Sequence, residues 1–232
     1  MNNIGIDNML DKKRIAHLFR LGIFAALMVL AGDILLGWGV ADLNASGMDR
    51  YFSRYLTVSN GRILWSAILG LIGIPIECLS YFGVYRLIAS KSEKYAHIYR
   101  AGLFGMLTFG AFTHVVCCAT VYYLNSVNAL NPVVTSESTL RFAEFFLLPV
   151  MILFLPFYLT AAITQFVAFV KGLTPYPKWC CIFTFLAGLV VVVITRFLGN
   201  EPIVYALSTG WISLGALWTF GGLLVTMKKA DM

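Results

Sequence analysis

The stretch that decides the fold is residues 21–40, LGIFAALMVLAGDILLGWGV. A run of roughly 20 apolar residues is long enough to cross the hydrocarbon core of a bilayer as one helix. The run is longer than the apolar region of a secretory signal peptide, it contains Asp33, and no clear cleavage site of small residues follows it. We therefore expect residues 21–40 to form a transmembrane helix that is retained in the protein.

The composition of the whole chain extends this interpretation. Of the 232 residues, 59% are hydrophobic and only 12% are charged, whereas charged residues make up about 25% of an ordinary soluble domain. These values predict an all-α polytopic membrane protein with six transmembrane helices, which form a single integral membrane domain over residues 1–232. The predicted helices are residues 21–40, 62–89, 98–124, 139–170, 179–198 and 203–227.

The distribution of Lys and Arg predicts the orientation of this bundle. Basic residues are enriched in the cytoplasmic loops of membrane proteins, so the side with more of them is expected to face the cytoplasm. The segments on the side of the two termini hold 12 of the 17 basic residues, including every lysine. We expect a multi-pass protein of the cell membrane with both termini in the cytoplasm. The net charge of +6 then meets lipid headgroups and not nucleic acid.

Ionisable side chains inside a bilayer are energetically costly, so they usually face other helices or a hydrated cavity. Four of them fall in the predicted spans, namely Asp33, Glu77, His114 and Glu144. At about 1.5 Å per residue, Asp33 and His114 lie at matching depths, roughly 18–20 Å from the cytoplasmic ends of their helices. Glu77 lies nearer the cytoplasm, at about 13 Å, and Glu144 lies near the outer rim.

Each of the three deeper residues shares a helix face with small or polar residues at spacings of three and four. Small residues allow a second helix to approach closely, so these faces predict contacts between helices. The three faces are Gly22, Ala26, Asp33 and Gly37; Ser66, Gly70, Gly73, Glu77 and Ser80; and Gly110, His114, Cys117, Cys118 and Tyr122.

These patterns lead to a hypothesis about a site. We expect Asp33, His114 and Glu77 to line one polar cavity that serves as a ligand or proton site, because an imidazole beside a carboxylate can bind and release a proton near neutral pH. The alternative is that each group is satisfied separately by a hydroxyl, a backbone carbonyl or a partner helix. At the outer rim, Arg141 and Glu144 are one helical turn apart, which predicts an ion pair.

Hydroxyl groups on the predicted helices are weaker candidates for extending the same cavity. Ser and Thr in membrane helices usually donate to a carbonyl of their own helix, and we expect this of Thr209 and Ser213. The five cysteines are expected to be buried as small apolar residues.

The motifs of several enzyme classes are absent. The sequence contains no phosphate-binding Gly-x-x-x-x-Gly-Lys, no His-Glu-x-x-His and no Gly-x-Ser-x-Gly. We expect no cofactor and no bound metal. The pattern best fits a small transporter, or a carrier or receptor of a small or lipid-like ligand. The alternatives are a structural or accessory membrane subunit without its own chemistry, and an intramembrane enzyme acting on lipid. The oligomeric state is left open.

Overall fold

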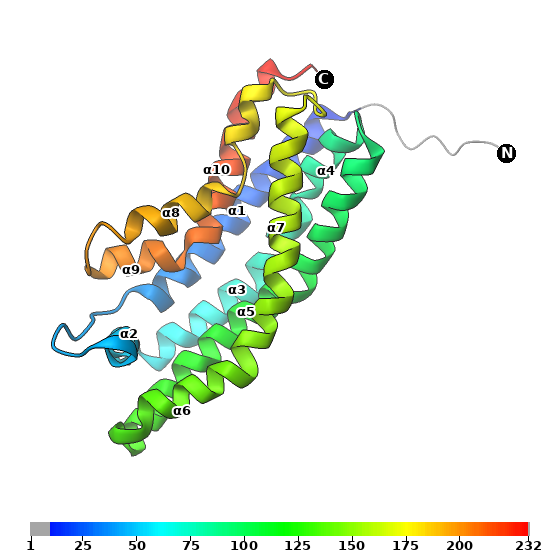
Figure 1. Ribbon diagram of the computed structural model, residues 1–232. Helices are drawn as coiled ribbons and strands as arrows, with labels where there is room; N and C mark the ends of the chain where they lie inside the picture. Colours follow the sequence, from blue (N-terminus) through cyan, green and yellow to red (C-terminus); the bar gives the residue numbers. More distant parts are fainter. Residues whose placement is uncertain (1–9, 232) are drawn as a thin grey trace.

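The computed structural model describes residues 10–231, and within that range the chain is helical and contains no β-strand. Figure 1 shows the helices side by side along a common direction. The α-helices are α1 (Lys12–Gly37), α2 (Gly47–Leu56), α3 (Asn60–Ser80), α4 (Phe82–Ala89), α5 (Glu93–Leu130), α6 (Thr135–Phe142), α7 (Leu148–Val170), α8 (Ala187–Thr195), α9 (Pro202–Thr209) and α10 (Trp211–Thr226). Shorter helical turns are η1 (Pro132–Val134), η2 (Ala143–Leu147), η3 (Lys178–Ile182) and η4 (Met227–Lys229).

Four continuous helical stretches are long and apolar enough to cross a membrane. The helices α9 and α10 form a fifth if they count as one span, although they are bent by 65° at their junction. The structure thus confirms an all-α protein with four to five candidate membrane spans. The four continuous stretches are Lys12–Gly37, Asn60–Ala89, Glu93–Leu130 and Pro132–Val170.

The helical stretches Lys12–Gly37 and Glu93–Leu130 are longer than the apolar runs within them. Asp11 caps α1 by accepting hydrogen bonds from the backbone N–H groups of Lys13 at 2.9 Å and Arg14 at 3.1 Å. Because this cap satisfies donors that the first helical turn leaves free, α1 begins at Lys12 and not at residue 21. Ser92 precedes α5 and accepts from the N–H of Tyr95 at 3.5 Å. Hydropathy therefore located the apolar part of each helix but not its start.

The predicted helix at residues 139–170 is confirmed, with an irregularity near its first proline. The turn η2 is π-helical, and the N–H of Leu148 donates to the carbonyl of Ala143, five residues earlier. Pro149 has no N–H to donate to the preceding turn, and a π-turn is one of the usual irregularities beside such a position. The chain continues into α7, and Pro156 lies within this helix.

The predicted helix at residues 179–198 is only partly present. It is replaced by the 3-10 turn η3, by irregular backbone at residues 183–186 and by the nine-residue helix α8. Side chains from α7 and α10 satisfy three carbonyls of this segment. Trp218 donates to Ile182 at 2.7 Å, Gln165 donates to Phe183 at 3.0 Å, and Tyr158 donates to Phe185 at 2.9 Å. A hydropathy pattern does not reveal this interruption, because the donors lie on other helices.

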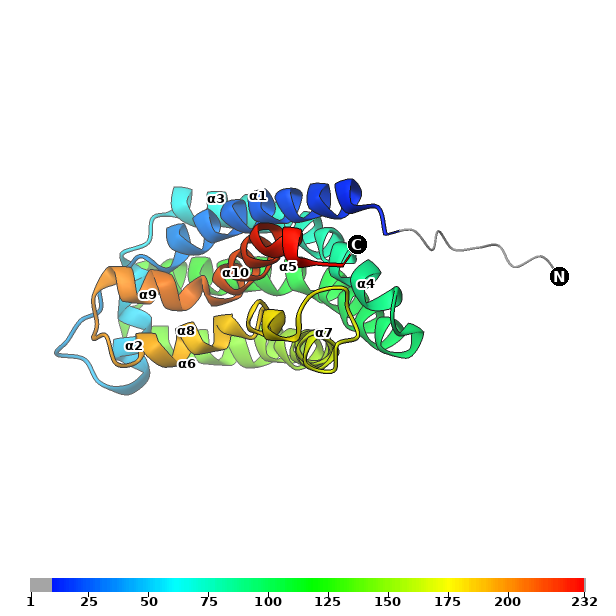
Figure 2. The ribbon, with the colours of Figure 1, turned by 90° about the horizontal axis from the view of Figure 1, so that it is seen from above.

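The helices pack in a definite order around α1 and α5. Helix α1 lies between α3 and α10, while α5 lies between α3 and α7. The start of α1, the junction of α4 with α5, the turn after α7 and the C-terminal turn η4 all lie at one end of the molecule (Figure 1). These four segments carry 12 of the 17 basic residues. Figure 2 shows the same arrangement from above, with α1 and α3 on one side of α10 and α5.

The opposite end is closed by the short amphipathic helix α2. The Arg54 guanidinium of α2 lies over the rings of Tyr51, Tyr55 and Tyr205, at 4.4, 4.6 and 4.6 Å from their centroids. It also donates to the Tyr55 hydroxyl at 2.6 Å. Burial raises the pKa of that hydroxyl, so the phenol stays neutral. Because Tyr205 belongs to α9, this cluster ties α2 to the C-terminal part of the fold.

Arg54→Lys should loosen the attachment of α2. A lysine ammonium is a compact charge and does not stack on several rings as a planar guanidinium does, and a cation–π contact contributes about 0.5–2 kcal/mol. We expect faster hydrogen exchange of the α2 amides in Arg54→Lys. The matched control is Arg50→Lys, a change on the same helix outside the tyrosine cluster. Equal exchange in the two variants would show that the cluster does not hold α2.

Candidate functional site

Asp33 and His114 lie next to each other in the centre of the bundle. The Oδ1 atom of Asp33 on α1 lies 3.5 Å from Nδ1 of His114 on α5, and both side chains are 9% exposed. The hydroxyl of Ser213 on α10 donates to Oδ2 of Asp33 at 2.6 Å. The two residues that the sequence placed at matching depths are therefore brought together by three different helices.

The other side of the imidazole contacts α3. The Nε2 atom of His114 lies 3.0 Å from the backbone carbonyl oxygen of Ser66 and 3.3 Å from its hydroxyl. The thiol of Cys118 donates to the same hydroxyl at 3.5 Å. A continuous chain of contacts thus runs from Ser213 through Asp33, His114 and Ser66 to Cys118, and we call these five residues the polar network.

Glycine residues make the close approach around the network possible. A Cβ atom on Gly70 of α3 would collide with the His114 ring, and one on Gly32 of α1 would lie 3.1 Å from the Ser66 carbonyl oxygen. Gly70 belongs to the small-residue face predicted on α3. On the face predicted on α1, a Cβ atom on Gly22 would collide with Phe220 of α10 and one on Gly37 with Thr209 of α9, so both faces form contacts between helices. On α5, Gly110, His114 and Cys118 are buried as expected, whereas Tyr122 is 53% exposed.

The neighbours of the His114 ring indicate which of its nitrogen atoms carries a hydrogen. A carbonyl oxygen only accepts hydrogen bonds, so Nε2 of His114 carries a hydrogen and donates it to Ser66. The Nδ1 atom faces the Asp33 carboxyl group, and one proton between these two groups gives either a neutral pair or an ion pair with no net charge. With one proton between the two groups the buried pair carries no net charge, and gain or loss of a proton would leave an unbalanced charge inside the bundle.

Glu77 does not join this site. It is buried on α3, but it lies two turns beyond Gly70, which is about 10 Å along the helix. Its carboxyl group makes no hydrogen bond to another residue in the range 10–231. Asp33 and His114 therefore form a pair, and Glu77 is not hydrogen-bonded to it.

The predicted ion pair between Arg141 and Glu144 is replaced by another. Arg141 pairs with Glu137 at 2.7 Å, one α-helical turn earlier. Glu144 belongs to the π-helical turn η2, where the wider backbone changes the spacing that the prediction assumed. Both members of the observed pair are about 70% exposed, so its contribution to stability is small.

Two residues of the polar network were misjudged from the sequence. Ser213 was expected to bond within its own helix but donates to Asp33, while Thr209 does donate to the carbonyl of Tyr205 at 2.9 Å. Ser66 was noted only as a small residue of the α3 face. A serine between larger residues on the buried face of an apolar helix is the signal that could have identified both.

The order of Ser66, His114 and Asp33 resembles a serine hydrolase triad, but the hydrogen positions do not fit one. In such a triad the imidazole nitrogen that faces the serine takes the hydroxyl proton. Here that nitrogen already carries a hydrogen, which it donates to the carbonyl of Ser66, and the Ser66 side chain is fully buried. Among residues 10–231 no group of three His, Cys, Asp or Glu side chains is arranged to hold a metal ion.

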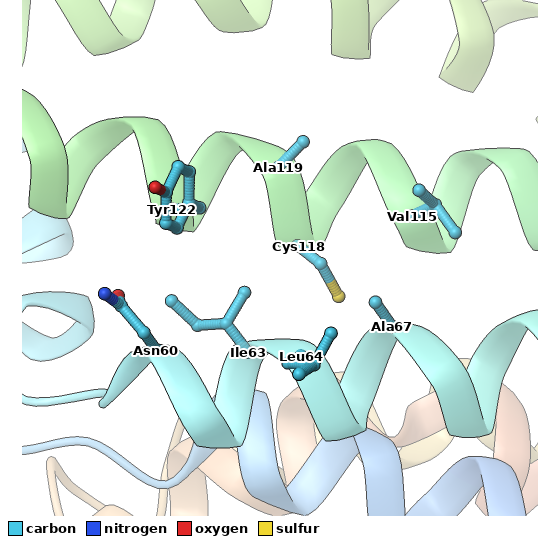
Figure 3. Close-up of a pocket in the computed structure, with 8 residues that line it drawn as sticks. All are labelled: Asn60, Ile63, Leu64, Ala67, Val115, Cys118, Ala119 and Tyr122. Atoms are coloured by element: carbon cyan, nitrogen blue, oxygen red, sulfur yellow. The ribbon is translucent and has the colours of Figure 1, made fainter.

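An apolar groove lies beside the polar network, between α3 and α5. It has a volume of about 430 Å³ and is lined by residues of these two helices only. Figure 3 shows the Cys118 side chain projecting from α5 toward α3, between the two walls. Because the Cys118 thiol also donates to Ser66, the groove and the polar network share this residue. The groove residues are Asn60, Ile63, Leu64, Ala67, Val115, Cys118, Ala119 and Tyr122.

Comparison with known proteins gives a family but no function. No curated protein and no solved structure matches the chain. A family model described as a family of unknown function (DUF6796) matches residues 1–230, nearly the whole chain, and the chain therefore belongs to that family.

Proposed function

We propose that this protein is a multi-pass integral protein of the cell membrane, with six membrane-crossing segments and both termini in the cytoplasm. The support is the set of four to five candidate spans and the gathering of basic segments at one end. The remaining crossing would be η3 with α8. Irregular backbone is tolerated inside a membrane where protein groups satisfy it, and the donors on Trp218, Gln165 and Tyr158 meet that requirement.

Within this membrane protein, the arrangement best supports a carrier or receptor of a small or lipid-like ligand, in which the Asp33–His114 pair is the buried polar site. The observation that carries the proposal is the contact between groove and network. A ligand in the groove would touch Cys118, which bonds to Ser66, which in turn contacts His114. Ligand binding and the protonation of the pair would then influence each other, as linkage requires.

Asp33→Asn tests this role of the pair. Oleate added to the purified protein in detergent should raise the melting temperature of the wild type, because a ligand that binds only the folded state at 100 times its Kd stabilises it by about 2.7 kcal/mol. Asp33→Asn should lose this shift, since the amide cannot share a proton with His114. The control Thr219→Val removes a buried hydroxyl that bonds within α10 and should keep the shift. An unchanged shift in Asp33→Asn would refute the role.

An accessory subunit without its own chemistry is the second candidate. It is favoured by the fact that Ser213, Asp33, His114 and Ser66 satisfy one another across four helices. In that case the polar network serves only to hold the four helices together. Asp33→Asn would lower the melting temperature, and oleate would have no effect on either protein.

A further inference from the structure

The surface of the groove between α3 and α5 is almost wholly apolar, and the two lining residues that carry an amide or a hydroxyl group lie at one end. Asn60 and Tyr122 lie at the end near the start of α3, and neither side chain hydrogen-bonds to another residue in the described part of the chain. Further along, the walls are Ile63, Leu64 and Ala67 on one side and Val115 and Ala119 on the other. This order matches a molecule with a hydrogen-bonding head and an apolar tail.

The groove is also open toward the surrounding lipid. Leu64 is 60% exposed and Tyr122 is 53% exposed, whereas Ile63 and Cys118 form a buried floor at 5% and 2%. Both helices are candidate membrane spans, so in the membrane this opening faces the bilayer. A ligand can therefore enter sideways from the lipid without passing through water.

The dimensions favour a single chain. The distance along α3 from Asn60 to Ala67 is about 10 Å, and the volume of about 430 Å³ is at the lower end of the range for ligand sites, roughly 300–1,000 Å³. The small side chains of Ala67 and Ala119 provide the width, one on each wall.

We propose that this groove binds a single-chain amphiphile of the fatty-acid type, taken up laterally from the bilayer. Its head lies at Asn60 and Tyr122, and its tail lies along the groove over Cys118. This inference rests on the proposed function, because it names the class of ligand whose presence the polar network would sense through Cys118 and Ser66.

Photolabelling tests the groove directly. The full chain is placed in phosphatidylcholine nanodiscs with a photoreactive fatty acid, and the labelled peptides are mapped by mass spectrometry. We expect labels concentrated on the groove segments of α3 and α5. Ala67→Phe and Ala119→Phe fill the groove from opposite walls, and each should reduce this labelling about tenfold, which corresponds to ~1.4 kcal/mol. Ile72→Phe is the control, because Ile72 is 51% exposed on α3 outside the groove.

The outcomes separate this inference from the proposed function. Labels spread evenly over the exposed helices, labels that both filling variants retain, or equal labelling by a photoreactive diacyl lipid would each overturn the groove as a single-chain site. If the groove is labelled as expected while Asp33→Asn keeps the response to oleate, the groove is supported as the binding site and the proposed role of the Asp33–His114 pair is refuted. If oleate stabilises the wild type but not Asp33→Asn, and the photoreactive fatty acid does not label the groove, the groove is refuted as the binding site and the role of the pair is supported.

Discussion

Replacing Gly70 by alanine should disrupt the polar network and destabilise the protein. The added Cβ collides with the His114 ring, so the imidazole must leave its position between Ser66 and Asp33. Overpacking a buried contact costs about 1–3 kcal/mol, and a displaced imidazole leaves the Asp33 carboxyl group without its partner. We expect a melting temperature several degrees lower and loss of the response to oleate, both measured by thermal unfolding in detergent.

The matched control is Gly61→Ala on the same helix. A Cβ atom at Gly61 has no neighbour within 4 Å, and alanine is favoured over glycine in a helix by about 1 kcal/mol. Gly61→Ala should therefore be as stable as the wild type or more stable. If Gly70→Ala behaves like Gly61→Ala in both measurements, His114 moves freely and the network does not depend on the close approach of α3 to α5.

Gly188→Ala should destabilise the protein more than Gly70→Ala does, through a different contact. A Cβ atom there collides with the backbone carbonyl oxygen of Trp211, and one on Gly215 would lie 2.6 Å from the Phe185 carbonyl oxygen. Helices α8 and α10 thus touch backbone to backbone, and a backbone cannot rotate away as a side chain does. We expect the free energy of unfolding to fall by about 3 kcal/mol, near the upper end of the range for overpacking.

Protease digestion is the measurement that distinguishes this effect from general instability. Separation of α8 from α10 should expose the chain between residues 196 and 201 to cleavage at temperatures where the wild type is resistant. Gly221→Ala on α10, where a Cβ meets nothing within 4 Å, is the control and should cleave like the wild type. Normal stability of Gly188→Ala would mean that the two helices do not approach this closely.

The sequence predicted the helical class and the position of the first four spans because both depend on local properties. The length of an apolar run and the spacing of small residues along a helix can both be read from a single segment. The matching depths of Asp33 and His114 also followed from counting residues, and these two groups do meet. Their meeting required only that the helices which carry them run side by side.

The features that the sequence did not predict depend on contacts between residues far apart in the chain. The interrupted segment at residues 182–186 accepts hydrogen bonds from Gln165, Tyr158 and Trp218, which no local pattern connects to it. Glu77 shares a face with Ser66 and Gly70, yet two helical turns separate it from the pair. A shared face gives the direction of a side chain but not its distance from another one, so the sequence did not show that the contact is between Asp33 and His114 alone. The groove required two helices to be placed relative to each other.

The interrupted segment at residues 182–186 also constrains how the protein is made. If the chain enters a membrane as proposed, the carbonyl groups of Ile182 and Phe183 in this stretch accept no backbone hydrogen bond within the described residues, whereas Phe185 also accepts from the N–H of Gly188 at 3.1 Å. The donors on α7 are synthesised before it, but Trp218 on α10 is synthesised after it. The carbonyl group of Ile182 therefore gains its donor only after α10 has been synthesised and has packed against the segment. In the proposed arrangement of six crossings, the last two would insert as a unit against a bundle already assembled from the first four, and truncation before Trp218 would leave an incompletely inserted protein.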